Sequence, residues 1–166
     1  MLASRIVSDL TGQIPEGNRI HSFIAVMREC GCSFDSQVIP TFGATGRYEY
    51  WEGEFTYRPG RLRLTARLTL EHDLAAVRTD ARIERSLVRT HREALHLLLT
   101  SNHVSYQFES DRDAPDHLVI RLTAYLYEDP PTVERMRSVV GQLASAHREL
   151  EHARDTAFRN YRPLIP

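Results

Sequence analysis

The stretch that decides the fold is residues 47–70, which read RYEYWEGEFTYRPGRLRLTARLTL. From Arg61 to Leu70, polar and apolar residues alternate. This period of two is typical of a strand with one buried face, because successive side chains of a strand point to opposite faces. Pro59-Gly60 separates this run from the aromatic-rich run before it and is a strong turn signal. The sequence therefore predicts an antiparallel hairpin over these residues.

Helical patterns are expected before the hairpin. Residues 3–11 could form a short helix, and Ile20, Phe23 and Met27 have helical spacing within a second one over 19–30. Gly31 stands where a left-handed residue would end that second helix. Residues 31–46 are expected to form a loop that could include one short strand.

Four more elements are expected after the hairpin. They are a helix over about 80–100 that ends near Asn102, strands over 104–109 and 118–127, and a long helix over about 132–158. The fold class predicted from this order is α+β, an antiparallel sheet of hairpins flanked by helices. We expect one domain over 1–166, with an N-terminal extension (1–17), a core (18–159) and a tail (160–166).

Composition excludes few functions, but it gives no support to nucleic-acid binding or to membrane association. The chain has 166 residues and a net charge of −1, so its total charge does not attract nucleic acid or an acidic membrane. All 21 basic residues are arginine, which is typical of a bacterial genome rich in G and C. We find no signal peptide and no apolar run of membrane-spanning length, and therefore expect a cytoplasmic protein without membrane association.

The candidate metal and catalytic motifs do not have the required spacing. Cys30 and Cys32 could be half of a zinc site, but the sequence offers no second pair of ligands. Two histidine pairs, His91/His96 and His147/His152, resemble a zinc-protease motif, yet each pair is five residues apart and not the four that would put both on one helical face. Gly43 to Gly46 lacks the strand–turn–helix context of a dinucleotide site. We expect no enzyme activity, no metal and no cofactor.

The aromatic run is the stronger functional signal. Aromatic residues fall on both faces of the predicted strand, so one face could pack inside the protein while the other contacts a partner protein. The expected partner-binding residues are Tyr48, Tyr50, Trp51, Phe55, Tyr57, Arg61 and Arg63. Arginine beside aromatic residues could also stack on single-stranded nucleic acid, so the alternative is a nucleic-acid-associated regulator that uses strand 47–67.

The last predicted helix carries a seam of apolar residues at spacings of three and four. Such a seam is typical of helix packing, within a chain or between two copies. We expect a homodimer whose interface is either this seam or the second hairpin. The seam residues expected to form that interface are Met136, Val139, Val140, Leu143 and Leu150.

The order of elements and several segments resemble the YbjN-like family, whose fold is that of type III secretion chaperones. The segments are residues 30–34, 97–102 running into 104–108, 117–122, and 131–150. The resemblance covers about residues 18–155. It implies a dimeric, non-enzymatic, chaperone-like or regulatory protein that binds a client protein. It implies no secretion apparatus and assigns a role to no individual residue.

Overall fold

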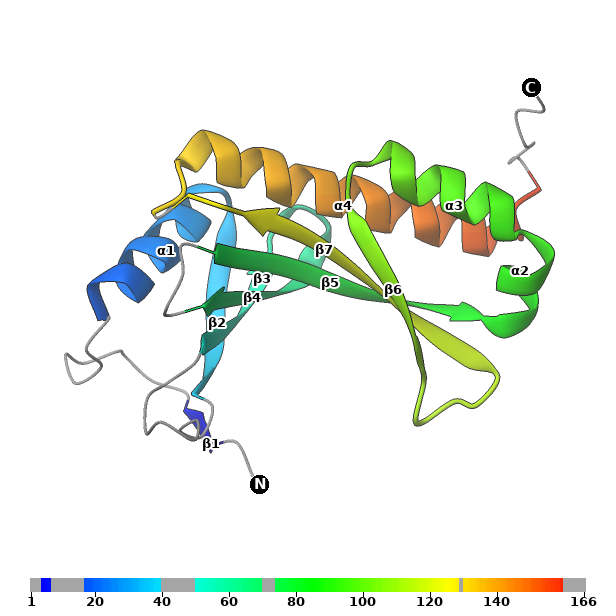
Figure 1. Ribbon diagram of the computed structural model, residues 1–166, viewed down its shortest axis with the longest axis horizontal. Helices are drawn as coiled ribbons and strands as arrows, with labels where there is room; N and C mark the ends of the chain where they lie inside the picture. The colour runs from blue at the N-terminus through cyan, green and yellow to red at the C-terminus, as the bar shows by residue number, and fades with distance from the viewer. Residues whose placement is uncertain (1–3, 7–16, 40–49, 70–73, 129, 160–166) are drawn as a thin grey trace. The chain divides into compact units, whose positions relative to one another are not determined.

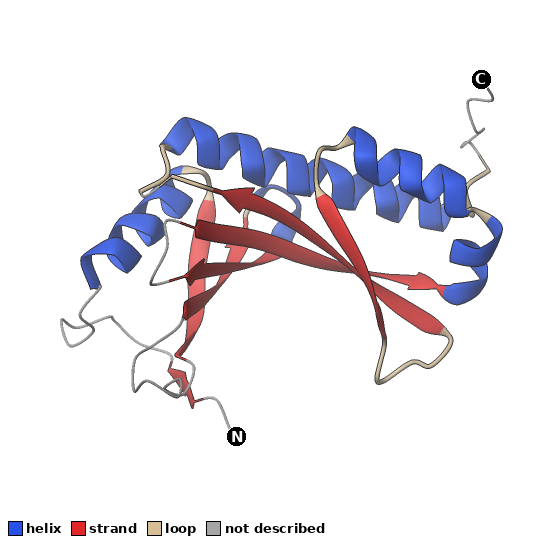
Figure 2. Ribbon diagram, viewed as in Figure 1, coloured by secondary structure: helices blue, strands red, loops and turns tan. Residues whose placement is uncertain are grey.

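A computed structural model describes residues 4–6, 17–39, 50–69, 74–128 and 130–159 (Figure 1). The elements are β1 (Ser4–Ile6), α1 (Gly17–Glu29), β2 (Cys32–Ile39), β3 (Tyr50–Tyr57), the 3-10 turn η1 (Pro59–Arg61), β4 (Leu62–Thr69), β5 (Leu74–Glu84), α2 (Arg85–Thr90), α3 (Arg92–Ser101), β6 (Ser105–Ser110), β7 (His117–Leu126) and α4 (Val133–Asp155). Helices and antiparallel strands both contribute, which confirms the α+β class (Figure 2). The kinship to secretion chaperones stays a prediction.

The chain forms two compact units. The first contains residues 1–77 and 125–140, and the second contains residues 78–124 and 141–166. Strands β5 and β7 and helix α4 contribute residues to both. The strand order is β1-β2-β3-β4-β5 in the first unit and β5-β7-β6 in the second. The expectation of a single domain stays a prediction.

The predicted hairpin of the first unit is confirmed. Strands β3 and β4 pair antiparallel from Tyr50↔Thr69 to Tyr57↔Leu62, and η1 joins them. Leu64, Ala66 and Leu68 are buried, as the alternation predicts. Polar residues between them lie on the other face of the strand.

An aromatic core holds α1 against this hairpin. The Phe23 ring of α1 meets the rings of Trp51 and Phe55 edge-on, with centroids 6.3 and 6.5 Å away. The Trp51 indole Nε1 donates to the side-chain oxygen of buried Gln37 over 2.9 Å, so its one polar atom is satisfied inside the core. Helix α1 ends as expected, because Gly31 has φ +87°.

The second unit packs α3 and the C-terminal half of α4 beside the β6–β7 hairpin (Figure 1). Leu95, Leu98 and Leu99 of α3 are buried. Asn102 ends α3 and links it to α4, since its Nδ2 donates to the Leu98 carbonyl over 2.8 Å and to Glu149 Oε2 over 3.2 Å. Strands β6 and β7 confirm the second predicted hairpin.

The helix expected over about 80–100 is wrong in two respects. Residues 80–84 end strand β5 and are not helical; buried Val77, Ala81 and Ile83 alternate with exposed or half-buried neighbours, a pattern that small side chains made faint. The expected helix is also broken at His91, which separates α2 from α3 with φ −122° and ψ 32°.

Two segments before the hairpin are strands: the expectation of a helix is wrong at residues 4–6, and the strand allowed within residues 31–46 is longer than expected. Residues 32–39 form β2, which pairs with β3, and residues 4–6 form β1, which pairs with β2. Both strands are stabilised by hydrogen bonds to strands that are distant in the sequence. A local sequence pattern does not show which distant segment a strand will pair with. The rest of the expected helix over 3–11 lies outside the described residues, as do Pro40 and the glycines at 43 and 46.

Candidate protein-binding site

Two of the residues expected to bind a partner are core residues instead. The side chains of Trp51 and Phe55 are 2% and 1% exposed, because their face of β3 is covered within the first unit by α1. They stabilise the fold and cannot touch a partner while it is intact. This corrects the expectation that they form a binding surface.

The other expected partner-binding residues are accessible to different degrees. Tyr50 and Tyr57 are half-buried, while Arg61 and Arg63 are exposed. Tyr48 lies outside the described residues. The expected partner-binding residues therefore do not form one surface, because some of them lie in the core and others are exposed.

The polar face of the β3–β4 hairpin carries both signs of charge. The Arg67 guanidinium lies 4.2 Å from the Tyr50 ring centroid and pairs with Glu52 Oε2 over 2.9 Å. Glu54 accepts a hydrogen bond from Ser36 on the same face. Carboxylates next to the arginines weaken the field that would attract a phosphate backbone.

The apolar seam of α4 is turned inward. Met136, Val139 and Val140 are buried, as are Leu143 and Leu150 further along the helix. Their apolar surface is already removed from water within one chain, so it offers nothing for a second copy to cover. This corrects the expectation that the seam forms a dimer interface.

The large exposed apolar side chains of the described residues lie elsewhere. They are Leu97 (44% exposed), Phe108 (41%), Tyr125 (42%) and Tyr127 (75%). Phe108 belongs to β6, where it shares one face of the strand with Tyr106. The two rings meet edge-on with centroids 5.7 Å apart.

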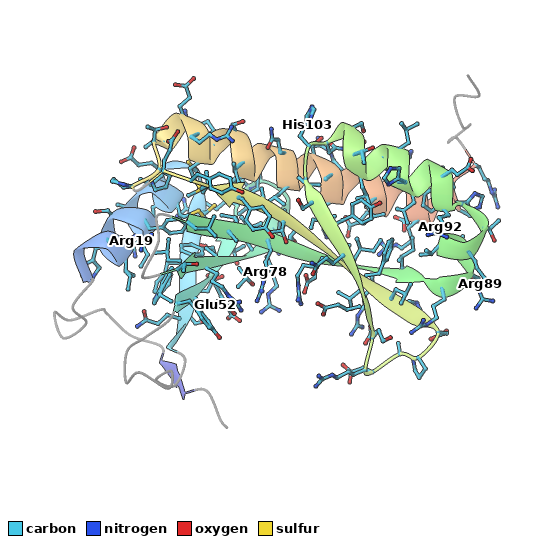
Figure 3. The ribbon with its side chains drawn as sticks, viewed as in Figure 1. Arg19, Glu52, Arg78, Arg89, Arg92 and His103 are labelled. Atoms are coloured by element: carbon cyan, nitrogen blue, oxygen red, sulfur yellow. The ribbon has the colours of Figure 1, made fainter. Side chains whose placement is uncertain are left out.

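A groove of about 650 Å³ runs between α3 and this face of β6. Its lining residues are Arg92, Glu93, Leu95, His96, Tyr106 and Phe108. The floor of the groove is formed by the Tyr106 and Phe108 rings. A hydrogen bond of 2.5 Å between His96 Nδ1 and the Tyr106 hydroxyl holds the Tyr106 ring against α3. Arg92, at the start of α3, puts a positive charge at the rim (Figure 3).

The opposite face of β6 is polar. Arg121 of β7 pairs with Glu109 Oε1 over 2.7 Å and with Asp80 Oδ1 over 3.1 Å. Gln107 lies directly across the strand pair from Arg121. This ion-pair network holds the register of the hairpin, so the aromatic residues stay on the groove side.

Strand β6 is also an edge. Among the described strands it pairs with β7 alone, so the amide and carbonyl groups of its other side have no partner strand there. Edge strands are usually protected by proline, lysine or a bulge. β6 reads SYQFES and has none of these, and its one charge, Glu109, is already bound to Arg121. We call β6 together with the groove the edge site.

A second hollow in the second unit is a weaker candidate. It has a volume of about 380 Å³ and charged walls that include Arg82, Glu84, His117 and Arg154. Arg82 pairs with the buried carboxylate of Asp111 over 2.8 Å, and Arg154 donates to the Arg82 carbonyl. Its charges are engaged in holding β5, α4 and the β6–β7 turn together.

Neither cysteine is activated. Both are buried and unbonded, and burial raises the pKa of the Cys32 thiol to about 12, with Cys30 adding to the rise. Burial also raises the pKa of Cys30. A protonated thiol is a poor nucleophile and a poor metal ligand. The described residues contain no group of three or more histidine, cysteine or acidic side chains placed to hold a metal ion.

Sequence reasoning gave the second hairpin as one of two expected dimer interfaces, but it singled out neither Tyr106 nor Phe108 as a binding residue. Tyr106 and Phe108 were read as ordinary strand residues. Their exposure follows from the place of β6 at the end of the strand order, which depends on pairing between distant segments. The available signal was an aromatic pair at spacing two in a short run with no apolar residue after it.

Comparisons with known proteins bear on the fold alone. No family model and no curated protein matches the chain. An uncharacterized protein from Methanothermobacter thermautotrophicus has a similar structure, with a TM-score of 0.58 and 9% sequence identity over 87% of this chain and 99% of that chain. None of the helices in the described part of the chain is long and apolar enough to cross a membrane. The chain therefore shares its α+β fold with a distant protein of solved structure.

Proposed function

We propose that this protein is a non-enzymatic, chaperone-like or regulatory protein that binds another protein at the edge site. The observation that carries the proposal is the aromatic face of β6, with Phe108 exposed and Tyr106 half-buried, on a strand whose outer edge meets no other described strand. An extended segment of the partner would pair with this edge as an added strand.

In strand addition, the backbone and the side chains of the bound segment contribute differently to binding. Main-chain hydrogen bonds along β6 would supply affinity, and a pocket for alternate side chains would supply specificity. The groove beside α3 is such a pocket, and its floor of Tyr106 and Phe108 suits an apolar side chain. Covering Phe108 would remove from water an apolar surface that is now 41% exposed.

The mixed charge of the β3–β4 hairpin favours this proposal over the nucleic-acid alternative. Glu52 and Glu54 lie among its arginines, so the face lacks the one-signed field that single-stranded DNA needs. We expect the purified protein to cause no salt-dependent shift of a single-stranded oligonucleotide. A shift that disappears as salt rises would favour the alternative.

The test compares three forms of the protein as bait in a native lysate. Phe108→Ser removes the aromatic side chain at the edge site, while Tyr125→Ser removes one of nearly equal exposure, 42% against 41%, that lies outside the groove. We expect the wild type and Tyr125→Ser to retain one protein in near-stoichiometric amount after nuclease treatment. Phe108→Ser should lose most of it.

Two results would overturn the proposal. One is equal recovery by all three forms, which would place binding elsewhere. The other is loss of the retained material after nuclease treatment, which would show that nucleic acid had mediated it. Circular dichroism of each form verifies that the fold is intact.

A further inference from the structure

The sequence of β6 is suited to pairing with itself. We infer that a protein completing the β6 edge is a second copy of this chain, with the two β6 strands antiparallel and Gln107 on the two-fold axis. The inference rests on the proposed function, because it names the occupant of the same edge. The argument for self-pairing is that one alignment of two antiparallel β6 strands matches their aromatic and polar residues better than its neighbours.

An axis at Gln107 keeps the two faces of β6 distinct. In an antiparallel pair, directly opposed residues point to the same face of the sheet. With Gln107 opposite itself, Tyr106 faces Phe108 of the second copy, and Phe108 faces Tyr106. Both aromatic pairs fall on the groove side, next to the buried Leu122 and Ile120 that oppose Tyr106 and Phe108 in β7.

The polar face is compatible with the same register. Ser105 would oppose Glu109 of the second copy, and Gln107 would oppose Gln107, so no like charges face each other. The Gln107 amide would lie diagonal to Glu109 of the second copy and could donate to its carboxylate. Arg121 would remain bound to Asp80 and Glu109 of its own chain.

Neighbouring registers are less favourable. Moving the axis to Phe108 leaves one aromatic pair and sets each Tyr106 against Ser110, and moving it to Tyr106 likewise leaves one pair. Moving it to Glu109 places two carboxylates face to face. A shift that puts the axis between two residues would turn the aromatic face of one copy to the polar face of the other.

Cysteine substitutions test both the pairing and its register. Gln107→Cys should form a disulfide-linked dimer on mild oxidation, because residue 107 opposes itself. Ser105→Cys and Glu109→Cys should each remain monomeric when oxidised alone and form a linked dimer when mixed. Cys30 and Cys32 are buried, so they contribute little background. Arg112→Cys, exposed in the turn after β6, is the control for random collisions.

The association itself is measured by sedimentation. The wild type should show a concentration-dependent monomer–dimer equilibrium, and Phe108→Ser should raise its dissociation constant about tenfold, the scale of losing a buried aromatic anchor. Tyr125→Ser should leave the constant unchanged. A protein that stays monomeric at millimolar concentration would overturn the inference, as would Glu109→Cys or Arg112→Cys linking as readily as Gln107→Cys.

The two proposals fail in different ways. A monomer that retains another protein through Phe108 would refute self-pairing and keep the edge site as a partner-binding site. A dimer that Gln107→Cys does not link would refute this interface. If Phe108→Ser changes neither recovery nor self-association, both proposals are wrong.

Discussion

At the scale of single residues, Trp51 and Gly53 depend on each other. The indole lies over Gly53 so closely that a Cβ there would be 2.3 Å from Trp51 Cη2. Trp51 cannot move aside cheaply, because it is buried among aromatic rings and hydrogen-bonded to Gln37. Sequence alone showed an aromatic run, but which rings are buried depends on the helix that covers one face.

We expect Gly53→Ala to lower the free energy of unfolding by about 1–3 kcal/mol, since the added methyl group overpacks this core. The matched control is Gly141→Ala in α4, where a Cβ meets nothing within 4 Å. There the substitution should stabilise the helix by about 1 kcal/mol. Urea unfolding followed by tryptophan fluorescence measures both. If Gly53→Ala is neutral, the indole does not pack over Gly53 in solution.

The buried thiols give a pH dependence of known direction. Because the pKa of Cys32 is raised to about 12, the folded state holds that proton more tightly than the unfolded chain, whose thiol has a pKa of about 8.5. This group stabilises the fold below about pH 8.5, and the contribution is lost as pH rises toward 12. Stability should therefore fall over that range, and Cys32→Ala should reduce the slope.

Alkylation checks the same thiols directly. Iodoacetamide at neutral pH should leave the native protein unmodified and label both cysteines in denaturant, because only a deprotonated and accessible thiol reacts. Mass spectrometry counts the labels. Rapid labelling of Cys32 in the native protein would contradict its burial.

At the scale of elements, predictability depended on whether a pattern was local. The β3–β4 and β6–β7 hairpins, α1 and α4 carried strong periodicity or turn signals and were predicted close to their bounds. Strand β5 was not predicted, and its last residues were assigned to a helix because Ile83 and Leu87 are four residues apart, a spacing that fits a helical face. The polar interruption at His91 marked a real break between α2 and α3.

The hydrogen bond between Asn102, at the end of α3, and Glu149 of α4 offers a test at this scale. Asn102→Ala removes the bonds from Nδ2 to the Leu98 carbonyl and to Glu149, and should lower the free energy of unfolding by about 1 kcal/mol. Ser101→Ala removes only a bond within the helix and should change stability by less than about 0.5 kcal/mol. Chemical denaturation compares the two. Equal effects would mean that the link to α4 adds nothing.

At the scale of the whole molecule, the edge site follows from strand order. The sequence predicted the strand and gave its hairpin as a possible interface, but no local pattern in SYQFES says that this strand ends the sheet. The same limit explains the expected sites that the structure moved into the core. Trp51, Phe55 and the α4 seam are apolar in sequence, and only the fold decides whether such residues face inward or outward.

Hydrogen exchange of the β6 backbone amides tests the central claim most directly. The account predicts that the β6 amides pointing away from β7 exchange quickly in dilute protein and become protected when the concentration is raised about a hundredfold, as a second β6 strand completes the edge. Phe108→Ser should shift this protection to about tenfold higher protein concentration, and Tyr125→Ser should leave it unchanged. Exchange of the β6 amides that is the same at both concentrations, in wild type and variants alike, would contradict the account.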